Sequence, residues 1–272
     1  MQRPDAESSL VLWIGEVGSP EFSRIYDELA SVVAVEVCAS PAVALGRLAA
    51  CSEEPVLLLV AQRFPDEFPA AAIEPLRRRL PLTRCLALAG PWCEGEPRSG
   101  QPLPGAMRLY WHQWTAQTLH DLRKLLAGEI GVWSLPATTS EEDRLAVGLM
   151  KAEATGPAGL GPVCIVAHDR EAAAALADLL AAAKVSSVWR RTSCAVSGVT
   201  ATIVDLARGD EEEWRLLAEI ASAEAGPVLA LLGFPRPEDA ERAAWLGAAK
   251  LLSKPLCAAD LLAALQNAMS AT

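Results

Sequence analysis

The chain has 272 residues, of which 51% are hydrophobic, and its formal net charge is −10. This length suits one large domain or two of ordinary size, with enough apolar material for buried cores. The charge balance argues against nucleic-acid binding in either half, because residues 1–150 carry 13 Lys and Arg against 19 Asp and Glu, and residues 151–272 carry 11 against 15.

Three further features of the sequence concern its compartment. No apolar run approaches the roughly 20 residues of a membrane-spanning helix, and the first nine residues lack the basic and then hydrophobic pattern of a signal peptide. Seven cysteines without paired spacing fit reduced, mostly buried thiols. We therefore expect a cytoplasmic protein that makes no membrane contact.

The first half alternates strand and helix patterns. Strands are predicted at residues 10–14, 32–37, 55–60, 84–89 and 107–111, and helices at 22–30, 41–50, 70–79 and 116–126. The basic run Arg77, Arg78 and Arg79 ends the third helix, where it suits the negative end of the helix dipole. Residues 90–105 contain four Pro and four Gly, which excludes a regular helix before the fifth strand.

The second half repeats the alternation after a connecting segment. A short helix is predicted at 140–151 and a Gly/Pro-rich linker at 155–162. Strands follow at 163–167, 185–191, 201–205, 227–232 and 250–252, and helices at 171–183, 211–223, 238–246 and 259–269. This pattern predicts two doubly wound parallel-sheet α/β domains in tandem, with domains at 1–127 and 162–272 joined by a segment at 128–161.

An internal repeat supports the tandem arrangement. Gly105, Ala106 and Leu109 lie 142 residues before Gly247, Ala248 and Leu251. The same offset places His112 opposite Lys254. Since ligands of parallel sheets bind outside the carboxyl ends of the strands, these two positions belong to the edge where a site is expected.

Residues 247–255 contain a Gly-Ala turn, a short apolar strand and the pair Lys254-Pro255. This stretch resembles the last strand of the receiver domain of bacterial response regulators. The resemblance covers residues 163–270 well and 9–127 loosely, and it implies a flavodoxin-like fold with a role in two-component phosphorelay signalling. In that family two acidic residues hold a metal ion, an Asp accepts the phosphoryl group, a Thr or Ser senses it, and a Lys binds its oxygens.

The second half keeps only part of that pattern. Asp205 matches the acceptor and Lys254 the lysine, but Leu232 stands at the hydroxyl position. The acidic pair falls at Ala167 and His168, with Asp169 the nearest carboxylate. The resemblance therefore implies a pseudo-receiver in which Asp205 and Lys254 form an ion pair. No cofactor is expected, since Mg²⁺ would be needed only if Asp205 were phosphorylated.

The first half departs further from the family. Its acceptor position falls near Ala61 and Gln62, and its lysine position at His112 and Gln113. Glu16 is one remnant of the acidic pair. No phosphoryl chemistry is assigned to this half.

Aromatic residues suggest where a partner would bind. The candidates in the first half surround the Pro/Gly-rich loop and comprise Trp92, Arg98, Trp111, His112 and Trp114. Alternatively, these Trp residues pack inward to hold the loop. In the second half Trp214 and Trp245 are expected to be partly buried, and Trp245 is the better interface candidate because receivers pair through their last helices, which would allow a homodimer. Cys93, His112 and His120 have no recognised metal-ligand spacing, so no metal site is expected.

The expected function is signalling through contact with another, unidentified signalling protein, without enzymatic activity and without a DNA-binding output domain. Two alternatives remain open. One is a phosphorylatable receiver that uses Asp205, with His168 and Asp169 assisting a metal. The other is an enzyme or a small-molecule or nucleotide sensor at the strand carboxyl ends, for which the residues would be Glu16, His168, Asp169, Asp205 and Lys254.

Overall fold

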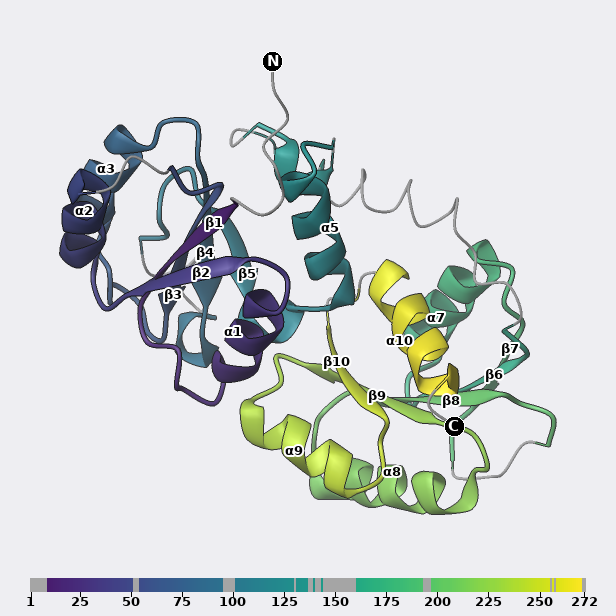
Figure 1. The fold of residues 1–272 in the computed structure, drawn as a ribbon. Coiled ribbons are helices and arrows are strands. Elements are labelled where there is room, and N and C mark those ends of the chain that lie inside the picture. The colour runs from purple at the N-terminus through teal and green to yellow at the C-terminus, as the bar shows by residue number, and fades with distance from the viewer. Residues whose placement is uncertain are drawn as a thin grey trace. The chain divides into compact units, whose positions relative to one another are not determined.

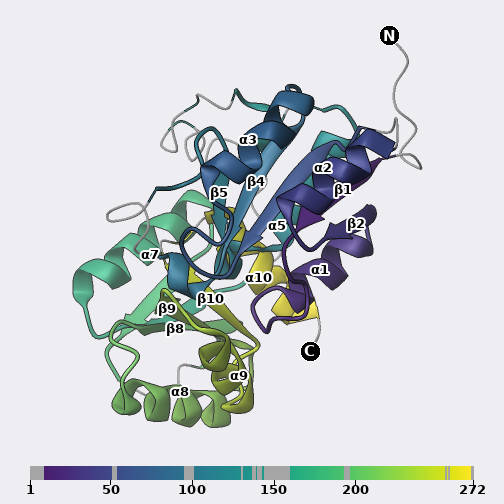
Figure 2. The same ribbon diagram turned by 90° about the vertical axis from the view of Figure 1, so that its left-hand side faces the viewer.

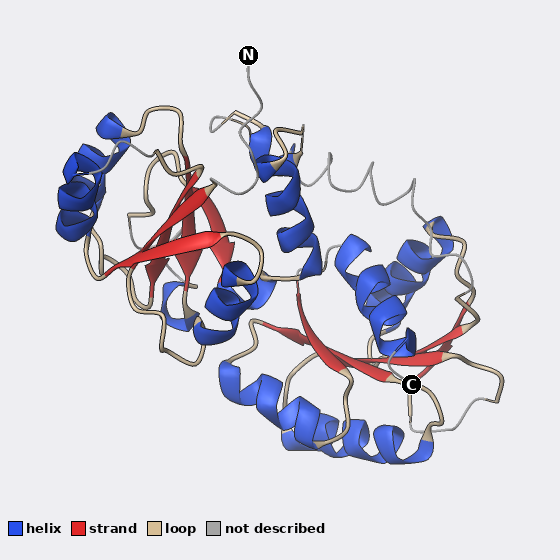
Figure 3. Cartoon of the chain, viewed as in Figure 1, coloured by secondary structure: helices blue, strands red, loops and turns tan. Residues whose placement is uncertain are grey.

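A computed structural model describes residues 9–50, 54–94, 101–129, 131–136, 139, 143, 160–192, 197–254, 256 and 258–270. The chain divides into two compact units, Met1–Arg144 and Leu145–Thr272 (Figure 1). Each unit contains a five-stranded, wholly parallel sheet with helices on both faces (Figure 3). The predicted fold class, two doubly wound α/β domains in tandem, is therefore confirmed.

The first unit follows the predicted alternation of strands and helices. Its strands are β1 (Leu10–Ile14), β2 (Ala34–Cys38), β3 (Leu57–Gln62), β4 (Arg84–Ala89) and β5 (Met107–Tyr110), and its α-helices are α1 (Ser23–Ala30), α2 (Pro41–Ala50), α3 (Ala70–Arg79) and α5 (Ala116–Leu126). Among the described residues, 3-10 turns lie at Pro91–Cys93, Trp111–Gln113 and Val132–Ser134. The strand order β2-β1-β3-β4-β5 is that of flavodoxin-like proteins, receivers among them.

Alternating strand residues of the first sheet enter two separate cores. Val11, Trp13 and Leu59 face α1 and α5, while Leu12 and Val60 face α2 and α3. Figure 2 shows α2 and α3 together along the sheet. Because both faces are covered, the central strands are buried along their whole length, which explains their continuous apolar sequences.

The second unit repeats this architecture. Its strands are β6 (Val163–Val166), β7 (Ser187–Arg190), β8 (Ala201–Leu206), β9 (Val228–Gly233) and β10 (Lys250–Lys254), and its helices are α7 (Arg170–Ala182), α8 (Glu211–Ala223), α9 (Pro237–Trp245) and α10 (Ala258–Ser270). The order β10-β9-β8-β6-β7 is the same topology read from the other edge. One core lies under α7 and α10, and the other under α8 and α9.

The structure differs from the predictions mainly at element ends. The fifth strand stops at Tyr110 instead of Trp111, because Trp111 already begins a 3-10 turn. The predicted helix at 140–151 and most of the predicted linker at 155–162 lie outside the described residues. Within the described residues, no helix has the length and apolar character that crossing a membrane requires.

The end of α7 provides a test of local backbone strain. Lys184 has φ of 61° and follows the helix in a Schellman arrangement, in which Val185 N donates to Leu180 O at 2.9 Å. A side chain is unfavourable in this left-handed conformation, whereas Gly accepts it. We expect Lys184→Gly to stabilise the protein by up to about 1 kcal/mol, measured as a higher urea midpoint by circular dichroism. Lys184→Ala, which removes the charge but keeps Cβ, should give no gain.

Candidate functional site

Asp205 and Lys254 meet at the carboxyl edge of the second sheet. Asp205 is the fifth residue of β8 and Lys254 is the last residue of β10, so the contact spans β9 between them. Lys254 Nζ donates to Asp205 Oδ1 at 2.6 Å. The Asp205 side chain is only 3% exposed and that of Lys254 is 31% exposed. The expected ion pair is therefore present, as a charge-assisted hydrogen bond in a mostly desolvated position.

The loop that follows Asp205 is fixed by a second buried carboxylate. Glu213 accepts hydrogen bonds from the backbone N–H groups of Arg208, at 2.8 Å, and Gly209, at 2.7 Å. Asp210 caps α8 by accepting from Glu213 N at 3.1 Å, and Trp214 Nε1 donates to Gly209 O at 2.9 Å. Sequence reasoning missed this arrangement, although the Asp210-x-x-Glu213 spacing is a capping-box signal.

The corner where a receiver holds its metal has a different composition here. Asp169 is exposed and serves as the N-cap of α7, accepting from Glu171 N at 2.7 Å. His168 Nε2 lies 3.4 Å from an Arg191 guanidinium nitrogen. The positive charge of the Arg191 guanidinium disfavours binding of a divalent cation beside His168. The Asp169 carboxylate already accepts a hydrogen bond at the amino end of α7.

Two other observations bear on the same edge. Leu232 is buried in the core under α8 and α9, and it presents no hydroxyl to the site. Across the described residues, no group of three or more His, Cys, Asp and Glu side chains has an arrangement that could hold a metal ion.

Strand register locates the corresponding acceptor position in the first unit. Asp205 pairs with Leu231 on β9, and Ala61 pairs with Leu88 on β4. Leu88 corresponds to Leu231, because each is the last residue of its strand to enter the core under the first and last helices of its unit. Ala61 therefore takes the place of Asp205, and its methyl group can accept no phosphoryl group. The expectation that the acceptor lies near Ala61 and Gln62 is met at Ala61.

The lysine position in the first unit differs from the one predicted. The ladders pair Leu88 with Leu109 in the first sheet and Leu231 with Leu252 in the second. Lys254 follows its paired residue by two positions, so Trp111 and not His112 takes its place. The fixed offset of 142 residues was wrong here by one, because Leu109 follows Gly105 by four residues whereas Leu252 follows Gly247 by five.

Arg63, which directly follows β3, forms ion pairs at the carboxyl edge of the first sheet. The Arg63 guanidinium forms an ion pair with Glu16 and donates to Glu67 Oε1 from two nitrogens, at 2.9 Å and 2.6 Å. The hydrogen bond to Glu67 raises the pKa of Arg63 above its ordinary value. Glu16, the proposed remnant of the acidic pair, thus shares the Arg63 guanidinium with Glu67.

The aromatic candidates of the first unit divide into two groups. Trp92 is largely exposed and remains available to a partner. Trp114 is buried in the core under α1 and α5, and Trp111 packs against the same core, so the inward-packing alternative holds for both. Trp114 is therefore corrected from a surface anchor to a core residue. Arg98 lies outside the described residues.

His112 is held within a small aromatic cluster. Its ring stacks on Tyr110 with centroids 5.6 Å apart and meets Trp111 edge-on at 5.8 Å. Its side chain is only 2% exposed, and Glu94 Oε1 lies 3.7 Å from Nε2. Burial lowers the pKa of His112 to about 4. The ring is neutral near pH 7 and is better suited to packing than to contacting a partner.

The Trp residues of α8 and α9 have opposite environments. Trp214 is buried and has the Arg242 guanidinium 4.8 Å from its ring centre. Trp245 is 85% exposed, although partial burial was expected. The reason is helical geometry, since the buried face of α9 passes through Ala243 and a residue two positions later points away from it.

Comparisons with known proteins give structural similarities and no sequence relatives. No family model and no curated protein matches the chain. Among solved structures, a response regulator receiver domain protein from Clostridium thermocellum is 21% identical, with 41% of this chain and 96% of that chain covered and a TM-score of 0.37. A putative two-component system response regulator/GGDEF domain protein is 12% identical over 96% of this chain and 98% of its own, with a TM-score of 0.37.

A third similarity is to the C-terminus of RcsC from E. coli, which contains a linker region and a phosphoreceiver domain. It is 14% identical, covers 97% of this chain and 94% of its own, and has a TM-score of 0.36. Identities and TM-scores of this size are too low to transfer an activity. The strand order defines a class of fold, the receiver-like α/β domain, which each of the two units adopts. The second unit also contains the Asp205–Lys254 pair.

Proposed function

We propose that this chain is a signal-transduction protein whose second unit is a pseudo-receiver, acting through protein–protein contact without phosphorylation. The observation that carries the proposal is the composition of the carboxyl edge of the second sheet. Asp205 and Lys254 are kept as an ion pair, but the metal corner is occupied by His168 beside Arg191. Asp169, the nearest carboxylate, caps a helix.

The chemistry explains why the missing groups matter. Phosphoryl transfer to a carboxylate develops negative charge that a divalent cation and a lysine must neutralise together. Mg²⁺ requires several oxygen ligands in near-octahedral geometry. At this edge one oxygen of Asp205 already accepts from Lys254 at 2.6 Å, and Leu232 offers no hydroxyl. Lys254 alone neutralises the resting carboxylate, which favours a structural role for the pair.

A contact function also fits the exposed aromatics. Trp245 on α9 is the most exposed Trp of the second unit, and interface anchors are enriched in Trp. We propose that α9 contributes to contact with another signalling protein or with a second copy of the chain, in the cytoplasm. Neither enzymatic activity nor nucleic-acid binding is part of this proposal.

Phosphorylation chemistry provides the test. After incubation with acetyl phosphate and Mg²⁺, we expect intact-mass spectrometry to find no adduct of about 80 Da, the mass of one phosphoryl group. A catalytically intact receiver domain treated in parallel serves as the positive control. An adduct on this protein that disappears in Asp205→Asn would contradict the pseudo-receiver proposal and favour the phosphorylatable alternative.

A further inference from the structure

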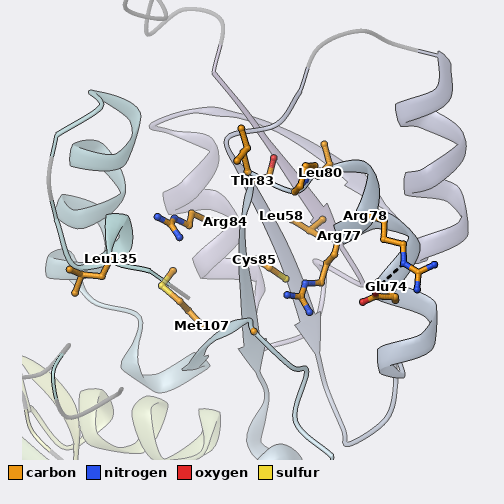
Figure 4. Close-up of a pocket in the computed structure, with 13 residues that line it drawn as sticks. Leu58, Glu74, Arg77, Arg78, Leu80, Thr83, Arg84, Cys85, Met107 and Leu135 are labelled. Atoms are coloured by element: carbon orange, nitrogen blue, oxygen red, sulfur yellow. Dashed lines mark hydrogen bonds and ion pairs between the residues drawn. The ribbon is translucent and has the colours of Figure 1, made fainter. Parts of the chain in front are cut away.

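A pocket of about 490 Å³ lies in the first unit, at the amino ends of its strands and so at the opposite edge from the site described above (Figure 4). It is bounded by the last turns of α3, the turn that leads into β4, the first residues of β4, and Gly105, Met107 and Leu135. This volume falls within the range of pockets that hold small organic ligands.

The pocket wall carries a local positive charge in an acidic protein. Among the described residues that line it, three are arginines, Arg77 and Arg78 from α3 and Arg84 from β4, and one is a carboxylate, Glu74. Glu74 is paired with Arg78 at 3.1 Å (Figure 4). Two guanidinium charges therefore remain uncompensated by carboxylates lining the pocket.

Arg77 and Arg84 each donate a hydrogen bond to a backbone carbonyl and have further N–H donors. Arg84 Nη2 donates to the backbone carbonyl of Ser134 at 2.7 Å, and Arg77 Nη1 donates to that of Pro104. Gly105 has φ of 64°, and a Cβ there would meet Arg77 Nη2 at 2.5 Å, so the absent side chain makes room for the guanidinium. Since a guanidinium has five N–H donors, these contacts orient Arg77 and Arg84 while leaving donors for a ligand.

Stabilisation of the helix end does not account for the whole arrangement. Basic residues at the carboxyl end of α3 suit the helix dipole. This explanation is sufficient for Arg79, which does not line the pocket and pairs with Glu54 at 3.1 Å. Arg84, however, belongs to a strand, and it lines the same pocket as Arg77 and Arg78. In Figure 4 the Arg84 side chain extends toward Met107, whereas that of Arg78 extends toward Glu74.

The remaining wall is apolar. Leu58, Leu80, Met107 and Leu135 contribute hydrocarbon surface beside the arginines. We propose that this pocket binds a small organic anion, a phosphate or a carboxylate that carries an apolar ring. The guanidinium groups contact the anionic end and the apolar side chains contact the ring. This site is independent of Asp205 and Lys254, and the proposal does not rest on the pseudo-receiver function.

Titration calorimetry of the full-length protein at fixed ionic strength tests the proposal with four probes: phenyl phosphate, benzoate, inorganic phosphate and benzyl alcohol. We expect saturable binding of one or both organic anions, weaker binding of inorganic phosphate and none of benzyl alcohol. The tighter of phenyl phosphate and benzoate identifies the anionic group. Arg84→Gln and Arg77→Gln should each weaken binding about tenfold, the effect of losing a charged hydrogen bond.

Arg79→Gln is the matched control, since it removes the same charge from the same helix turn outside the pocket, and it should change affinity less than about twofold. Arg77 is only partly buried, so its variant keeps the test valid if Arg84→Gln fails to fold. The proposal is overturned if neither organic anion binds saturably, if benzyl alcohol or inorganic phosphate binds as tightly as they do, or if Arg79→Gln weakens binding as much as Arg77→Gln.

Discussion

Lys254→Met is expected to lower the free energy of unfolding by about 3 kcal/mol, because it leaves the Asp205 carboxylate buried without its cation. Asp205 is nearly inaccessible to water, and its hydrogen bond from Lys254 is 2.6 Å long. The pair is therefore unlike an exposed ion pair, whose loss costs about 1 kcal/mol or less. Urea denaturation followed by circular dichroism measures the difference.

A double-mutant cycle supplies the control. In an Asp205→Asn background the buried charge is already absent, so adding Lys254→Met should cost much less than it does in the native chain. Equal costs in the two backgrounds would mean that Lys254 stabilises the fold through its hydrocarbon stem and not through Asp205. Such a result would also weaken the view that the pair is retained for structure.

Lowering the pH from 7 to 4 is expected to cost the first unit about 3 kcal/mol through His112 alone, since each unit of pKa difference corresponds to about 1.4 kcal/mol. Burial lowers the pKa of His112 in the folded protein to about 4, from an ordinary value of 6.5. The folded state therefore binds fewer protons than the unfolded state between these values. The contribution is fully present above pH 6.5 and is lost as the pH falls through 4.

The measurement compares urea midpoints across this pH range in the native chain and in His112→Gln, which cannot titrate. The variant should lose less stability on acidification than the native protein. His120→Gln, a change at an exposed histidine, is the matched control variant. If His112→Gln follows the native curve, the pKa of His112 is not lowered in the folded protein, and the nearby Glu94 carboxylate then offsets the burial.

The carboxyl edges of the two sheets have one feature in common. In the second unit the carboxyl edge keeps a buried acid and its lysine, whereas in the first unit Arg63 pairs with Glu16 and Glu67 at the same edge. In each case a cationic side chain of the protein pairs with carboxylates at this edge. This shared feature is the reason that we favour stability and surface contact over phosphoryl chemistry in both units.

The sequence by itself determined the architecture and the residues that pair across the second sheet. Alternating apolar strands and amphipathic helices specify a parallel sheet covered on both faces, because no other arrangement buries strands such as β3 on both sides. The Gly-Ala turn and the Lys254-Pro255 pair then fixed which strand is last and which edge carries the ion pair. These signals are local or periodic, and hence readable from one chain.

The tertiary structure alone decided features that depend on distant neighbours. The strand register shows that Trp111, and not His112, corresponds to Lys254 in the first unit. The packing of α8 and α9 determines that Trp214 is buried and Trp245 is exposed. The arginine-lined pocket joins Arg77 and Arg84 to carbonyl groups 27 and 50 residues further along the chain. Such contacts have no sequence period, because they follow from how the connecting segments return to the sheet.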